Sequence, residues 1–127
     1  MTLKMSEIVS LKGTCENLKE QKASVKTAYK ISKALTAIEK EFEFYQNKFS
    51  EIIAEFSEKD ENGQPILIND GAGVKIAPEN REETQKRLIE LENVEVELNI
   101  KPLSLDELEG LEISISDMQN LSSIIEE

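Results

Sequence analysis

The chain has 127 residues, of which 39% are hydrophobic and 32% charged, and its formal net charge is −11. This composition is typical of one globular, helix-rich domain and excludes a largely disordered chain. With no histidine, a single cysteine and no apolar stretch near the roughly 20 residues of a membrane span, we expect a cytoplasmic protein that is not an enzyme. We also expect no metal site, no cofactor and no membrane partner.

The first predicted helix begins near Ser6, which can act as its N-cap. Gly13 lies within this helix and predicts a kink or a break there, because glycine costs about 1 kcal/mol relative to alanine in a helix. Cys15 is expected to be a small buried apolar residue rather than a reactive thiol. The apolar face repeats at steps of 3, 4 and 3 residues and comprises Ile8, Leu11, Cys15 and Leu18.

A longer apolar pattern follows, with a mean period of 3.5 residues and no glycine or proline inside it. We call this set the apolar seam; it comprises Ile31, Leu35, Ile38, Phe42, Tyr45, Phe49, Ile52 and Phe56. The seam predicts one long helix from about Ser24, its N-cap, to Ser57. Such a stripe packs against other helices, as in a coiled coil, within the chain or in another copy. We therefore expect an antiparallel hairpin with the first helix and a homo-oligomer.

Residues 66–68 and 73–76 flank Asn69-Asp-Gly-Ala and predict a β-hairpin with a glycine-assisted turn. A helix is expected from Pro78 to about Glu92, with Leu88 and Leu91 facing inward.

Residues 94–101 alternate between apolar and polar side chains, which predicts a half-buried strand. Ser104-Leu-Asp-Glu107 is a capping box that opens a short helix ending at Gly110. A brief strand is expected at Glu112–Ile115. A last helix is expected after a second capping box that starts at Ser116.

Together these elements predict an α+β fold: a long antiparallel helical hairpin with a small antiparallel β-sheet and short C-terminal helices. We expect one domain over residues 1–127. Residues 1–57 would form the helical hairpin, and residues 58–127 the β-hairpin, helix, strand and C-terminal helices.

The candidate binding residues lie at the start of the long helix. At 100° per residue, Lys26, Lys30 and Lys33 fall within about 60° of one another, on the face opposite the seam. Tyr29 lies at the edge of that face. Ammonium groups beside a phenol can hold a phosphate-bearing ligand or an acidic protein surface. An ordinary solvated helix face is the simpler alternative.

Charge is distributed unevenly along the chain. Residues 1–38 carry seven lysines against three acids, whereas residues 39–127 carry eight bases against 23 acids. We expect no direct nucleic-acid binding, because the acidic part would repel phosphates. The acidic residues near the C-terminus instead suggest mimicry of nucleic acid as an alternative, although such charge is commonly solubilising. These residues are Asp106, Glu107, Glu109, Glu112 and Asp117.

Four short segments carry a resemblance to a known group of proteins: Lys4–Val9, Val25–Lys33, Asn93–Leu98 and Leu108–Ser114. In these segments the chain resembles an uncharacterised family of small proteins from tailed phages and prophages of low-G+C Gram-positive bacteria. The resemblance implies a phage-encoded protein that acts in the cytoplasm of the bacterial host, and it implies no catalytic residues.

Three functional hypotheses follow. The first is a non-enzymatic phage accessory protein that binds and neutralises a host protein, such as a component of antiviral defence. The second is a sponge that sequesters a negatively charged nucleotide signal on the face formed by Lys26, Tyr29 and Lys33. The third is a component of virion assembly or scaffolding.

Overall fold

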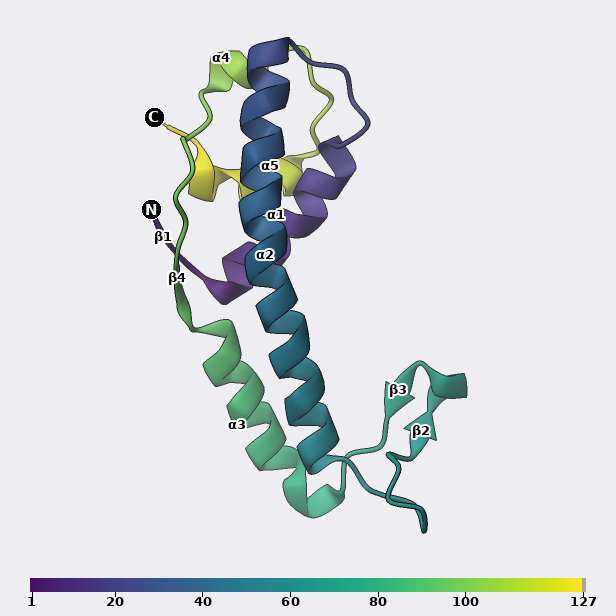
Figure 1. Ribbon diagram of the computed structural model, residues 1–127. Coiled ribbons are helices and arrows are strands. Elements are labelled where there is room, and N and C mark those ends of the chain that lie inside the picture. The colour runs from purple at the N-terminus through teal and green to yellow at the C-terminus, as the bar shows by residue number, and fades with distance from the viewer. Residues whose placement is uncertain (127) are drawn as a thin grey trace. The chain divides into compact units, whose positions relative to one another are not determined.

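The structure, a computed structural model, describes residues 1–126 and has the predicted α+β fold (Figure 1). Its contacts divide the chain into two compact units. Unit 1 comprises Met1–Glu43 and the segment from Val94 onward, and unit 2 comprises Phe44–Asn93. The organisation of residues 1–127 as one domain stays a prediction.

The first helix of unit 1, α1, spans Met5–Leu18. Lys4 is its N-cap, and the Lys4 backbone N–H donates to the Glu7 carboxylate at 3.0 Å. The prediction of Ser6 as the cap was therefore wrong. The Glu7 side chain accepts from the Lys4 N–H, so the N-cap is two residues earlier than predicted. The predicted break at Gly13 was also wrong. The helix continues through Gly13. A Cβ atom built at this position would have no other atom within 4 Å, so close packing does not require glycine here.

The second helix, α2, spans Val25–Phe56 and is continuous, as the apolar seam predicts. Ser24 caps it, since the Thr27 N–H donates to the Ser24 hydroxyl at 3.3 Å. The two helices form the predicted helical hairpin. In α1 the buried face is formed by Met5, Ile8, Leu11, Thr14, Cys15 and Leu18, and α2 adds Thr27, Ala34 and Ile38.

A two-stranded antiparallel sheet in unit 1 joins β1 (Thr2–Lys4) to β4 (Glu95–Glu97), with Leu3 opposite Val96. Both side chains at this central pair are buried. The strand predicted at residues 94–101 is present but shorter. Its pairing partner at the N-terminus was not predicted from the sequence.

Two short helices follow β4. Ser104 caps α4 (Leu105–Leu108) in the predicted capping box, and Gly110 follows with a φ of 92°. The next helix, α5, spans Ile115–Leu121 and ends in a 3₁₀ turn, η3 (Ser122–Ile124).

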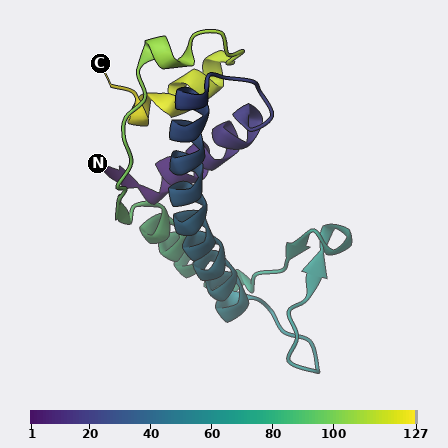
Figure 2. The same cartoon turned by 45° about the horizontal axis from the view of Figure 1, so that its top comes forward.

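The boundary of α5 corrects two predictions. Its cap is Ser114, whose hydroxyl accepts from the Asp117 N–H at 3.0 Å, and not Ser116. The strand expected at Glu112–Ile115 is instead the approach to this helix. Helix α5 packs against α1 (Figure 2). Leu121 and Ile124 are buried.

In unit 2, β2 (Leu67–Ile68) pairs with β3 (Gly73–Val74), which confirms the predicted β-hairpin. The turn η1 (Asn69–Gly71) needs residues that tolerate positive φ, and its three φ values are 54°, 56° and 89°. The 3₁₀ turn η2 (Pro78–Asn80) then leads into α3 (Arg81–Glu92), which ends where predicted.

The core of unit 2 is small. Of the hydrophobic side chains at residues 44–93, all of which the structure describes, Ala77 and Leu91 are buried. Leu88, which was expected to face inward, is half-buried. Several large apolar side chains of this unit are more than one third exposed: Phe44, Phe49, Leu67, Ile68 and Ile89.

Candidate anion-binding site

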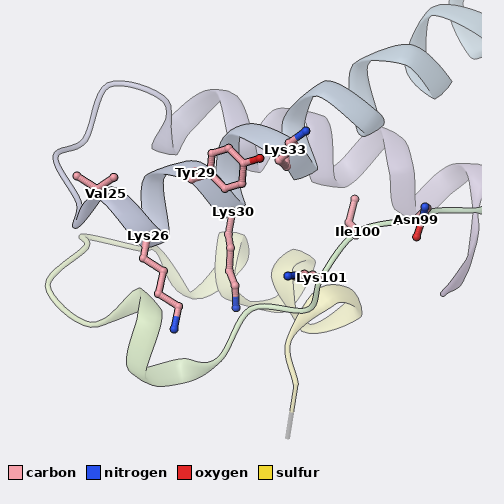
Figure 3. A pocket seen from close by; sticks show the side chains of 8 residues that line it. All are labelled: Val25, Lys26, Tyr29, Lys30, Lys33, Asn99, Ile100 and Lys101. Carbon is pink, nitrogen blue, oxygen red and sulfur yellow. The ribbon is translucent and has the colours of Figure 1, made fainter.

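A pocket of unit 1 lies between the first turns of α2 and the chain segment that follows β4 (Figure 3). We call it the lysine pocket; it is lined by Val25, Lys26, Tyr29, Lys30, Lys33, Asn99, Ile100 and Lys101. Its volume is about 750 Å³. That is within the range of 300–1,000 Å³ that is typical of small-molecule sites.

Helical spacing brings most of the pocket lysines together. Lys26, Lys30 and Lys33 are separated by four and three residues, so successive turns of α2 present them on one side. All the binding residues predicted on α2, including Tyr29, line this pocket.

The sequence did not indicate that Lys101 belongs to the same site. Lys101 is the one basic residue after Arg87, and this isolation could have marked it as a candidate site residue. No local sequence pattern, however, connects it to α2. Residues 99–101 line the pocket because the path of the chain after β4 places them beside the first turns of α2.

The charged and apolar groups occupy different parts of the pocket. In Figure 3 the side chains of Lys26, Lys30 and Lys101 extend toward the same side of the site. Lys33 lies beside Tyr29, with its ammonium nitrogen 5.6 Å from the centre of the phenol ring. This distance permits a cation–π contact. Tyr29 as a whole is 62% exposed.

One pocket lysine has an acidic partner within the chain. The Lys30 ammonium lies 2.9 Å from Oε1 of Glu107, to which it donates a hydrogen bond, and 2.8 Å from Oε2. Oε2 has no hydrogen bond of favourable geometry, so its contact is an ion pair by distance. The Ser104 N–H also donates to Oε1, at 3.0 Å. Lys30, and then Ser104, lower the pKa of Glu107 to about 2.

The backbone of Glu107 strengthens the connection between α4 and α2. The Thr27 hydroxyl donates to the Glu107 carbonyl at 3.0 Å, and Thr27 is buried. Glu107 therefore holds the first turns of α2 through both its main chain and its side chain. The position of Lys30 is fixed by these contacts.

The other three pocket lysines carry uncompensated charge. Lys26, Lys33 and Lys101 have no carboxylate within 4 Å anywhere in the described part of the chain. The pocket is thus a cationic site on a protein of net charge −11. Unpaired ammonium groups that line a concave surface attract anions.

The apolar seam is distributed between both units. Ile38 is fully buried, whereas Phe49 is 38% exposed. The remaining members are half-buried: Ile31, Leu35, Phe42, Tyr45, Ile52 and Phe56.

Several seam rings make specific contacts. Lys12 lies over the Phe42 ring at 4.9 Å, and Arg87 lies over Phe56 at 5.7 Å. The rings of Tyr45 and Phe49 are 5.9 Å apart. Burial, followed by the Glu92 carboxylate, raises the pKa of the Tyr45 phenol. The role of the seam in oligomer formation stays a prediction.

The acidic residues near the C-terminus do not form one free surface. Glu107 is paired with Lys30, and Asp117 accepts hydrogen bonds from Thr14 at 2.9 Å and Asn17 at 3.3 Å. Asp106, Glu109 and Glu112 are exposed. Mimicry of nucleic acid would therefore depend on fewer charges than the sequence indicates.

Cys15 is poorly placed to act as a nucleophile. Cys15 is 2% exposed, and burial, with smaller contributions from Glu16 and Glu39, raises the pKa of its thiol to about 11. A thiol of this kind is a weak nucleophile at neutral pH. Residues 1–126 also contain no cluster of three or more cysteine, aspartate or glutamate side chains that could hold a metal ion.

Comparisons with protein families, curated proteins and solved structures found no match. The resemblance to small phage proteins therefore remains a hypothesis. Among the helices of residues 1–126, none has the length and apolar character needed to cross a membrane.

Proposed function

We propose that this protein is a non-enzymatic binding protein that captures an anionic ligand in the lysine pocket. The observation that carries the proposal is that Lys26, Lys30, Lys33 and Lys101 all line one concave site of an otherwise acidic chain. A solvated helix face would explain the three lysines of α2. It would not explain why Lys101, from a distant part of the sequence, lines the same site.

The size and surroundings of the pocket favour a small ligand over a nucleic acid. A duplex or single strand needs an extended basic surface, and 23 acids against eight bases at residues 39–127 oppose this. The pocket volume of about 750 Å³ is suited to a ligand of nucleotide size.

The biological setting follows from the family resemblance. In a phage protein of the host cytoplasm, capture of a small anion would remove a signal or metabolite of the host. We therefore propose neutralisation by sequestration, with a negatively charged signal of antiviral defence as the ligand.

A second candidate is neutralisation of a host protein by direct contact. It is favoured by the exposed apolar side chains of unit 2, which include Phe44, Phe49 and Ile89. Large exposed apolar groups of this kind are common where proteins bind one another.

Affinity purification from infected cells separates the two candidates. The tagged protein would be compared with a pocket variant, in which Lys26, Lys33 and Lys101 are replaced by alanine. The matched control replaces Lys19, Lys40 and Lys86, three lysines that do not line the pocket, so both variants lose the same charge.

Bound small molecules and bound proteins would be identified by mass spectrometry. Sequestration predicts an anionic molecule that the wild type and the control retain and the pocket variant loses. A host protein retained equally by all three, with no small molecule, would instead support the second candidate.

A further inference from the structure

The lysine pocket has an apolar part as well as a charged one. Val25 is 88% exposed and Tyr29 is 62% exposed, and Ile100 lines the same site. A simple inorganic anion would contact the lysines and leave these side chains in water. A ligand that carries a flat ring next to its anionic group would cover both parts.

The charged part is suited to phosphate. Lysine ammonium groups are compact point charges on flexible stems, and they adapt to the several oxygens of a phosphate or diphosphate. The side chains of Lys26, Lys30 and Lys101 extend toward one side of the pocket (Figure 3). Of these three, Lys26 and Lys101 have no acidic partner among residues 1–126, whereas Lys30 is paired with Glu107.

Glu107 sets the net charge of the pocket. Its carboxylate compensates Lys30, at 2.8 Å, and among residues 1–126 Lys26, Lys33 and Lys101 have no acidic partner. Three uncompensated positive charges match a ligand with two or three negative charges. This is the charge of a nucleoside diphosphate or of a nucleotide with two phosphodiester groups.

We propose that the lysine pocket is a nucleotide site. The base would lie against Tyr29 and the neighbouring apolar surface, and the phosphates would contact Lys26, Lys30 and Lys101. Lys33, beside the phenol ring, would add positive charge near the base and sugar. Glu107 acts as a positioning residue that orients Lys30. This inference rests on the proposed function, which it makes more specific.

Isothermal titration calorimetry with the full chain tests the assignment. The probes are ADP, ADP-ribose and cyclic di-AMP as nucleotides, adenosine as the uncharged control and inorganic pyrophosphate as the control without a base. We expect at least one nucleotide to bind tenfold or more tightly than both controls. Its affinity should fall as salt is raised, because exposed ammonium groups are screened.

Two variants separate the contributions of ring and charge. Tyr29→Leu should weaken nucleotide binding about tenfold, because base–aromatic stacking is lost, and leave pyrophosphate binding unchanged. The double variant Lys26→Ala with Lys101→Ala should weaken the binding of both. The double variant Lys19→Ala with Lys40→Ala, at two lysines that do not line the pocket, is the matched control and should change neither.

Two results would overturn the nucleotide assignment and leave anion capture intact. One is pyrophosphate binding as tightly as every nucleotide. The other is no binding of any nucleotide, together with a different anion that co-purifies in a pocket-dependent way. If no probe binds and no pocket-dependent ligand co-purifies, the assignment and the proposed function both fail.

Discussion

Replacing Ile38 by alanine tests how the stability of unit 1 depends on α2. Ile38 is 0% exposed, and it lies in a core to which α1 contributes Ile8 and Leu11. Replacing a fully buried isoleucine by alanine lowers the free energy of unfolding by about 2–5 kcal/mol, because apolar contacts are lost and a cavity remains. We expect about 3 kcal/mol, or a fall in Tm of about 12 °C for a chain of this length.

The matched comparison is Phe49→Ala, which removes a larger side chain from the same helix and the same seam. Phe49 is 38% exposed, so within one chain its truncation should cost less than about 1.5 kcal/mol. Urea unfolding followed by circular dichroism at 222 nm would measure both values. A cost below 1 kcal/mol for Ile38→Ala would refute the burial argument.

The dependence of stability on protein concentration tests whether the apolar seam joins two copies of the chain. If the seam joins two copies, Phe49 becomes buried in the oligomer, and Phe49→Glu would place a charge in that contact. The loss in stability should then grow with protein concentration, and light scattering should show a smaller particle than the wild type. A wild type that stays monomeric at micromolar concentration would contradict the predicted homo-oligomer.

Three further predictions concern single sites. The lowered pKa of Glu107 means that its ion pair with Lys30 stabilises the protein above about pH 4.5 and is lost as the pH falls toward about 2. Glu107→Gln should therefore lower the Tm at pH 7, and the difference should disappear near pH 2. Cys15 should react with a thiol reagent far more slowly in the native protein than in urea, because it is buried and its pKa is about 11. Ser114→Ala should cost about 1 kcal/mol through loss of the α5 cap, whereas Ser116→Ala should stay within about 0.5 kcal/mol; equal costs would contradict the assigned cap.

Local patterns predicted much of the fold. The period of the apolar seam indicated α2 to within one residue at its C-terminal end, and Ser24 was correctly identified as its cap. The capping box from Ser104 to Glu107 and the turn at Asn69–Gly71 were also recognised, because their signals lie within a few adjacent residues.

The features that the sequence did not predict depend on distant contacts. Strand β1 has three residues and pairs with a segment more than 90 positions away, so no local periodicity could reveal it. Ser114 and Ser116 both have the spacing of a cap. Ser114 is the cap because its hydroxyl accepts from the Asp117 N–H, and the Asp117 side chain is held in place by hydrogen bonds from Thr14 and Asn17 of α1.

The candidate site shows the same division. Lys26, Lys30 and Lys33 share one helix, and their common face follows from helical spacing alone. The contribution of Lys101 requires the path of the chain after β4, and the pairing of Lys30 with Glu107 requires the position of α4. A sequence pattern could therefore identify the lysines of α2 but not the boundaries or the net charge of the pocket.

The pairing of β1 with β4 bears on how the protein folds during synthesis. Unit 2 is continuous in sequence, so all of it is translated before Val96 is added to the chain. Unit 1 can close only when Val96 arrives opposite Leu3. Until then, the nascent α1 also lacks α5, the helix that packs against it, so its apolar face is exposed and this interval is the point at which a chaperone would be most useful.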